Sequence, residues 1–262
     1  MRVAQSSIML IVGCIAACTL AGPVAVVDSA AGPASNVNDT SETASTTVEN
    51  SAISTIPGAI GPDVFADGIN PLTGLPAPDP ALLLQRPVIA KISNAPPLVR
   101  PQSGIGAADL VFEHYAEGGL TRFSAVFYSQ RPQRVGSIRS ARLIDYELMP
   151  MYEGLLMFSG ASIGVEERLN TSEFADRLYK GVLFGRPYYW RDDAIDAPHN
   201  MFSSAAALTE MAVEQGVNSA PDFNGMAFHP DAPSGDAGPA QSADIRYRAT
   251  RVQWQYDAET GL

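Results

Sequence analysis

The sequence predicts an α/β fold: a layered domain with a mixed β-sheet, followed by the start of a truncated, β-rich C-terminal domain. Three observations predict it. Short apolar and β-branched runs recur from residue 87 onward, helical patterns alternate with them, and two of the runs flank a Gly-Gly pair. A Gly-Gly pair between two β-rich runs is typical of an antiparallel hairpin. Strands separated by helices favour parallel pairing, so the sheet should contain both kinds of neighbour.

The strand pattern is clearest in the first half of this domain. Residues 87–92 form a short, largely apolar run after a Pro-rich approach, which is typical of a buried strand. Residues 109–115 and 121–128 flank Gly118-Gly119 and predict the hairpin. Because successive side chains of a strand point to opposite faces, the core face of the second hairpin strand should carry Phe123, Ala125 and Phe127.

Helical signals alternate with these strands. Ser140 is placed to cap a helix that runs to about residue 147, and residues 155–158 return as a buried strand. Residues 162–169 and 203–214 carry further helical patterns. The latter segment has an apolar stripe formed by Leu208, Met211 and Ala212.

The chain changes character towards its C-terminal end. A Pro- and Gly-rich segment at residues 220–240 predicts an interdomain loop, and residues 244–249 and 252–256 predict two strands followed by turn residues. A strand should return after this turn, so we expect a second domain that is cut off. The predicted organisation is a signal peptide at 1–17, a lipid anchor and disordered tether at 18–69, the α/β domain at 70–218, the interdomain loop at 219–243 and the truncated domain at 244–262.

The N-terminal residues predict export. One early charge at Arg2 precedes an apolar run from Ile8 to Ala17, which has the length of a signal-peptide core and is too short to span a bilayer. The small residues before Cys18 resemble the lipobox of bacterial lipoproteins, which predicts lipidation of Cys18 and an anchor on the extracytoplasmic face of the membrane. Ordinary cleavage near residues 29–31 and a weaker lipobox ending at Cys14 are the alternatives.

Composition narrows the remaining choices. Residues 34–62 are rich in small polar and acidic residues and lack aromatic ones, so they predict a disordered tether or, alternatively, a propeptide remnant. Both cysteines lie in the processing region, which leaves the folded part without a thiol for a disulfide, a nucleophile or a metal. The net charge of −11 argues against a nucleic-acid partner, because phosphate binding needs a basic face.

A set of arginine, acidic and histidine side chains is the candidate ligand site. Arg139 and Arg142 lie three apart at a predicted helix start, where the helix N-terminus also favours anions. We interpret the set as a polar cleft that grips an anionic or polyhydroxyl ligand through Arg forks. The alternative is a structural network of Arg–carboxylate pairs that ties the loops to the sheet. The candidate ligand-binding residues are Arg122, Arg139, Arg142, Arg191, Asp109, Glu113, Glu117 and His199.

No catalytic residue can be assigned from the sequence. Glu113 and Glu117 could form an acid–base pair for glycoside hydrolysis, but carboxylates near a hairpin are more often ion-pair partners. His199 has no recognisable partner for a general base, and together with His114 and His229 it lacks the ligand spacing of a metal site. The sequence contains no phosphate-cradling loop, so we expect neither a cofactor nor a metal.

Seven short motifs occur in order: Arg-Pro-Val at 86–88, Arg-Pro-Gln-Ser-Gly at 100–104, Ala-Asp-Leu-Val-Phe-Glu at 108–113, Glu-Gly-Gly-Leu-Thr-Arg-Phe at 117–123, Gly-Ser-Ile-Arg-Ser-Ala-Arg at 136–142, Arg-Asp at 191–192 and Ala-Pro-His-Asn at 197–200. In this combination they resemble the YerB-like family of uncharacterised bacterial lipoproteins. The resemblance covers roughly residues 70–204, and residues 254–257 resemble the opening of that family's C-terminal domain. It implies an envelope lipoprotein of two domains and no settled activity.

We therefore expect a cell-envelope lipoprotein that binds a wall-associated ligand such as a polysaccharide or peptidoglycan. A hydrolase of wall glycan or peptide and an envelope assembly protein that binds another protein are the alternatives. An open cleft with Glu113, Glu117 and His199 within hydrogen-bond reach would favour the hydrolase, and an exposed apolar patch beside the hairpin would favour the assembly protein. The expected partners are the membrane, through a lipid anchor, and a cell-wall polymer or envelope protein, with no nucleic acid.

Overall fold

The computed structural model describes residues 58–231, 240–257 and 259. The predicted signal peptide, Cys18 and most of the predicted tether lie outside the described residues. Within the described ranges, no helix combines the length and the apolar character that crossing a bilayer requires.

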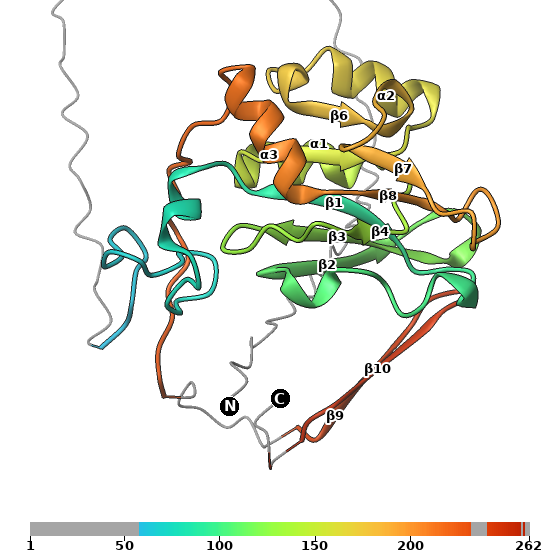
Figure 1. Ribbon diagram of the computed structural model, residues 1–262. Coiled ribbons are helices and arrows are strands. Elements are labelled where there is room, and N and C mark those ends of the chain that lie inside the picture. Colours follow the sequence, from blue (N-terminus) through green and yellow to red (C-terminus); the bar gives the residue numbers. More distant parts are fainter. Residues whose placement is uncertain (1–57, 232–239, 258, 260–262) are drawn as a thin grey trace, which may run out of the picture. The chain divides into compact units, whose positions relative to one another are not determined.

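A five-stranded mixed sheet is the main element of the domain (Figure 1). Its strand order is β2-β3-β1-β5-β6. The strands β2, β3 and β1 pair antiparallel, whereas β5 and β6 continue from β1 in parallel, so the predicted mixed sheet is confirmed. The five strands are β1 (Val88–Ser93), β2 (Leu110–Tyr115), β3 (Thr121–Phe127), β5 (Leu155–Phe158) and β6 (Leu178–Lys180).

The β2–β3 hairpin follows the predicted runs closely, because β-branched and aromatic residues dominate both strands. Gly118 and Gly119 lie between the strands with positive φ values of 73° and 82°, a region that residues with a Cβ rarely adopt. The register places Glu113 opposite Phe123 and His114 opposite Arg122. This register brings charged side chains of both strands to the turn end of the hairpin.

Both faces of the sheet are buried, whereas the alternation in β3 predicts a single core face. The predicted face, with Ala125 and Phe127, packs on the side of α3 (Ala205–Glu214), which contacts β1 and β5. The opposite face, with Val126 and Tyr128, is equally buried with residues of α1 (Ile144–Tyr152) and α2 (Ile163–Asn170). Sheets that contain parallel strands are covered by helices on both faces, which explains the second apolar face.

The helices differ from the prediction mainly at their ends. The helix α1 begins at Ile144 and continues to Tyr152, so Ser140 does not cap it. The side chain of Ser204 caps α3 by accepting a hydrogen bond from the backbone N–H of Ala207 at 3.1 Å. Short 3₁₀ turns occupy Pro80–Leu84, Pro97–Val99, Ile105–Ala107, Glu117–Gly119, Ala175–Arg177 and Gly181–Leu183.

A second, three-stranded antiparallel sheet escaped prediction. Its order is β4-β8-β7, with β4 (Val135–Gly136), β8 (Met201–Ser203) and β7 (Tyr189–Arg191). Strands of two or three residues are too short to display an alternating pattern. The backbone N–H of Ser93 donates to the carbonyl of Ser137 at 2.9 Å, which ties this sheet to the end of β1. The loops that follow β4 and precede β8 therefore meet the C-terminal end of β1.

The predicted C-terminal strands form an antiparallel hairpin, β9 (Ser242–Arg246) and β10 (Arg251–Gln255). Most of its side chains are exposed, and the backbone N–H of Ala249 donates to the carbonyl of Gly119 at 2.9 Å. The segment before it contributes to the domain as well: Phe223 packs edge-on against Tyr128, with ring centroids 5.1 Å apart. The first part of the predicted interdomain loop thus covers the second face of the sheet.

Candidate ligand-binding site

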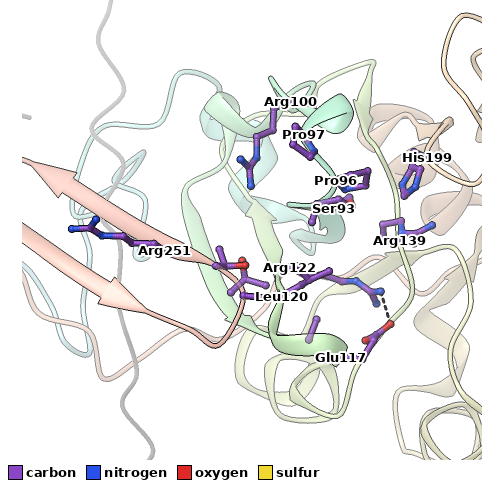
Figure 2. A pocket seen from close by; sticks show the side chains of 15 residues that line it. Ser93, Pro96, Pro97, Arg100, Glu117, Leu120, Arg122, Arg139, His199 and Arg251 are labelled. Carbon is purple, nitrogen blue, oxygen red and sulfur yellow. Dashed lines mark hydrogen bonds and ion pairs between the residues drawn. The ribbon is translucent and has the colours of Figure 1, made fainter.

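A pocket of about 570 Å³ opens where β1 ends and the β2–β3 hairpin turns (Figure 2). The C-terminal ends of parallel strands are the usual place for a ligand site in α/β sheets. We call it the arginine pocket. Its charged or titratable lining residues are Arg100, Glu117, Arg122, Arg139, His199 and Arg251.

Glu117 is clamped at the margin of this pocket by two arginines. Arg122 Nη2 donates to Glu117 Oε1 at 2.9 Å, and Arg142 Nε donates to Glu117 Oε2 at 2.8 Å. Arg122 also donates to the carbonyl of Ser140 at 3.0 Å. Although partial burial acts to raise it, the pKa of Glu117 is lowered to about 2 by the hydrogen bond from Arg142 and by the two arginine charges. Glu117 is therefore ionised at neutral pH.

Arg139 and His199 lie in the same pocket with fewer protein partners. Arg139 Nη1 donates to the carbonyl of Pro198 at 3.1 Å, and no other side-chain hydrogen bond of Arg139 occurs within the described ranges. Arg139 Nε and His199 Nδ1 are buried, and neither has a partner among the described residues. Figure 2 shows the two side chains next to each other at one side of the pocket. Polar groups in this state are the ones a ligand can satisfy.

The arginine pocket carries an excess of positive charge. Its lining includes four arginines, of which Arg251 pairs with Asp244 and Arg122 pairs with Glu117, the single acidic side chain that lines it among the described residues, so Arg100 and Arg139 supply the excess. Burial and then the charge of Arg142 lower the pKa of Arg122 to about 10. Burial lowers the pKa of Arg139 too, and the neighbouring Glu117 only partly offsets this. An added anion stabilises cations that are crowded in this way. The positive charge of the pocket contrasts with the net charge of −11 of the whole chain.

A buried polar network lies behind the clamp, on the α1 face of the sheet. Lys91 Nζ lies 2.8 Å from Asp145 Oδ1, and both side chains are fully buried. The same ammonium donates to Ser124 Oγ at 2.5 Å and lies 2.7 Å from His114 Nε2. All three N–H groups of Lys91 are thereby used. Burial and then the charge of Lys91 lower the pKa of His114 to about 3, so this imidazole is neutral and accepts from Lys91.

Comparison with known proteins assigns the fold to a family. A family model described as "Protein of unknown function (DUF3048) N-terminal domain" matches residues 72–218. The chain belongs to this family. It is 35% identical over 177 residues to the Bacillus subtilis (strain 168) protein named "Putative lipoprotein YerB", a match that covers 67% of this chain and 51% of YerB. The chain therefore spans about half the length of this curated relative.

The crystal structure of the Bacillus subtilis YerB protein has the same fold. It matches with a TM-score of 0.62 at 30% sequence identity, covering 73% of this chain and 63% of that chain. The family model, the curated relative and the structure agree with the YerB-like resemblance of the motifs. The mixed α/β architecture is thus that of the YerB-like family.

Within this YerB-like domain, the predicted site residues separate into groups. Arg122, Arg139, Glu117 and His199 line the arginine pocket, and Arg142 supports it from behind through Glu117. Glu113 instead accepts from Asn94 at 3.0 Å and from Thr121 at 2.6 Å, and it lines a neighbouring hollow.

Asp109 and Arg191 do not line the arginine pocket. Asp109 is buried just before β2, where it accepts from the backbone N–H groups of Tyr128 and Ser129 and from the side chain of Asn70. Its role in the structure is to hold the start of the hairpin. Arg191 donates to Asn200 Oδ1 at 2.6 Å and bridges the loop between β7 and β8.

The alternative of an Arg–carboxylate network accounts for part of the set. The Glu117 clamp is such a network, and Arg134 with Asp192 forms a further exposed pair at 2.6 Å. No hydrogen bond joins the side chains of Glu113, Glu117 and His199 among the described residues. In the same ranges, no group of three His, Cys, Asp or Glu side chains is arranged to hold a metal ion.

Sequence reasoning missed Arg100 and the buried Lys91 network. Arg100 stands in one of the family motifs, but the turn that brings it to the pocket is a 3₁₀ turn at Pro97–Val99 with no pattern of its own. Lys91 interrupts an otherwise apolar strand, which is a usable signal, because a lysine inside a buried strand needs an acidic partner. The position of that partner, Asp145, depends on how α1 packs.

Proposed function

We propose that this protein is a lipid-anchored cell-envelope protein whose arginine pocket binds an anionic group of a wall-associated ligand, such as a polysaccharide or peptidoglycan. Three features support the location. The N-terminal apolar run is followed by a lipobox-like Cys18, a small-residue polar tether comes next, and the relative carries the name "Putative lipoprotein YerB". A tethered domain outside the membrane would meet wall polymers first.

The observation that carries the ligand proposal is the state of Arg139 and His199. Both line a pocket that has room for a ligand, and both hold a buried nitrogen without a partner among the described residues. Arg139 has no carboxylate partner there, whereas Arg122 and Arg142 share Glu117. An anionic group bound beside Arg139 would receive charge-assisted hydrogen bonds from a guanidinium that the fold leaves available.

A glycan hydrolase has less support from this geometry. A general acid must be protonated near neutral pH, whereas the arginine clamp lowers the pKa of Glu117 to about 2. Glu113 lies in a different hollow, where its Oε1 accepts hydrogen bonds from Asn94 and Thr121. The pKa of His199 is lowered by burial and by the charge of Arg139, so its imidazole is neutral, but no described carboxylate orients it as a base.

The assembly-protein alternative has one observation in its favour. Tyr115 and Leu120 are exposed at the turn end of the β2–β3 hairpin, with 58% and 39% of their surfaces accessible. Exposed apolar side chains at a hairpin favour contact with another protein when they form a continuous patch. This alternative becomes the first choice if the protein does not bind isolated cell-wall material.

Binding of the intact exported protein to isolated cell-wall material tests the proposal. We expect Arg139→Ala to weaken binding by about tenfold or more, the loss expected when a charged hydrogen-bonding group is removed. The melting temperature should stay within a few degrees, because the substitution leaves no carboxylate unpaired. The matched control is Arg186→Ala, an exposed arginine that lies against Trp190 and lines no part of the pocket.

Chemical treatment of the wall material separates the sources of the anionic group. Hydrofluoric acid removes phosphodiester-linked polymers, and amidation blocks carboxylates, so loss of binding after one treatment identifies the group that is bound. Unchanged wall binding by Arg139→Ala with intact stability would refute the pocket as the site. A large loss of stability in Arg139→Ala would show instead that this arginine supports the fold.

A further inference from the structure

Two further hollows adjoin the arginine pocket, and the three share lining residues. A side hollow of about 420 Å³ shares Arg100, Thr250 and Arg251 with it. A small hollow of about 150 Å³ on the other side shares Arg100 and His199 with it. Arg100 lines all three. The three hollows therefore adjoin one another around Arg100, and the arginine pocket shares lining residues with both of the others; we call these three adjoining hollows the path.

The side hollow has the surface of a sugar subsite. Its floor is apolar and comes from Val111 and Phe123 on the α3 face of the sheet and from Ile105 in the 3₁₀ turn beside them. Its rim is polar, with the amide of Gln102 and the carboxylate of Glu113, which is held in place by the amide of Asn94, a donor to both Glu113 and Thr121. A sugar ring presents an apolar face and a rim of hydroxyl groups, so amides, carboxylates and an apolar floor match it.

An aromatic side chain from the C-terminal hairpin completes this hollow. Trp254 on β10 lines it and keeps 42% of its surface exposed. An exposed tryptophan offers a flat apolar face with a polar N–H, which suits stacking against a ring. Arg251 contributes little charge to either hollow, because it pairs with Asp244 and points away from the other labelled side chains in Figure 2.

We propose that the path binds a linear glycan with anionic substituents, with one sugar unit in the side hollow and the next anionic group beside Arg100 and Arg139. This inference rests on the proposed function and extends it from one anionic group to a polymer. The two larger hollows each fall within the range of about 300–1,000 Å³ that holds one small ligand, so one unit would not fill the path. Glu113 would then hydrogen-bond sugar hydroxyls, a role outside catalysis.

The dependence of affinity on chain length tests this inference. The probes are galacturonic acid and its linear oligomers, neutral maltooligosaccharides of equal length, and inorganic phosphate with linear polyphosphate. Linking two subsites raises affinity steeply, by about 10²–10⁴ when the spacing fits. We expect galacturonate oligomers to bind at least about tenfold more tightly than the monomer. The increase in affinity with chain length should be smaller for the neutral glycans. It should also be smaller for polyphosphate relative to inorganic phosphate.

Two variants separate the subsites. Trp254→Ala should remove the gain with chain length and leave binding of the monomer unchanged. The matched control is Tyr256→Ala. Tyr256 is an exposed aromatic residue directly after β10, and it lines none of the three hollows. Arg139→Ala should weaken monomer and oligomer binding alike.

The possible results distinguish this inference from the function on which it rests. Galacturonate binding that depends on Arg139 but not on length would overturn the polymer path and leave the anion pocket standing. An equal gain for polyphosphate would overturn the sugar subsite. If the protein binds wall material but no galacturonate oligomer, this inference alone would be overturned. If the wild-type protein does not bind wall material at all, both the polymer path and the proposed function would be refuted.

Discussion

The buried ion pair between Lys91 and Asp145 leads to a quantitative stability prediction. Lys91→Met removes the ammonium and leaves the carboxylate of Asp145 fully buried without its cation. It also takes one hydrogen bond each from Ser124 and His114. Breaking a buried pair on one side lowers the free energy of unfolding by roughly 3–5 kcal/mol, because an uncompensated charge stays in the interior.

Such a loss is a large fraction of the stability of a domain, which is about 5–15 kcal/mol. For a domain of about 150–250 residues, each kcal/mol lowers the melting temperature by about 2–4 °C, so the expected shift is roughly 6–20 °C. Urea unfolding followed by fluorescence gives the free energy directly, and calorimetry gives the melting temperature.

The matched control is Lys180→Met on the neighbouring strand β6. Lys180 pairs with Glu166, but the two side chains are 24% and 30% exposed, so the expected loss is below about 1 kcal/mol. The double variant Lys91→Met with Asp145→Leu should recover part of the loss, since it removes both charges. The reasoning is refuted if Lys91→Met is no more destabilising than Lys180→Met.

Two further predictions concern acid stability and anchoring. The folded-state pKa of His114, lowered to about 3 by burial and by Lys91, lies below its unfolded value of 6.5, so the stability it contributes is present above pH 6.5 and is lost as the pH falls towards about 3. Urea titrations between about pH 6.5 and 4.5 should show the free energy of unfolding falling by up to about 1.4 kcal/mol per pH unit. In His114→Gln this free energy should depend less steeply on pH. Equal pH dependence in the two proteins would contradict the lowered pKa of His114. For the anchor, metabolic labelling with a fatty-acid analogue should label the wild type but not Cys18→Ser. An unlabelled wild type would exclude lipidation. Label that survives the substitution would assign the lipidation site to Cys14.

Elements defined by neighbouring residues could be predicted well. The hairpin of β2 and β3 and the strand β5 occur where the residue pattern places them, and the C-terminal pair occurs with β9 at Ser242–Arg246, earlier than the predicted run at 244–249. The strands β4, β7 and β8 could not be predicted, because runs of two or three residues contain too little pattern. The start of α1 was predicted too early, because serine is a common helix cap and Ser140 comes shortly before the helical pattern. In the structure Ser140 precedes the helix, and its carbonyl accepts a hydrogen bond from Arg122 on β3.

That the eight candidate residues bind a ligand stays a prediction, but the structure shows where they lie. Arg122, Arg139, Arg142, Glu117 and His199 lie in or against one pocket, whereas Asp109, Glu113 and Arg191 lie outside it. The sequence left open whether these residues serve a ligand or pair with one another, because pairing depends on residues far apart in the chain. In the structure Arg122 and Arg142 pair with Glu117, whereas Arg139 has no carboxylate partner among the described residues.

By itself, the sequence determined the α/β class, the mixed sheet and the family, because these follow from residue patterns within short segments, whereas the export signal stays a prediction. Only the tertiary structure decided how the charges are paired. The packing of α1 brings Asp145 to Lys91 and Arg142 to Glu117, whereas the link between β1 and the small sheet places Arg139 and His199 beside a pocket without a carboxylate of their own. Ion pairing acts over a few ångströms in space and not along the chain, so the arginines became distinguishable only once the chain was folded.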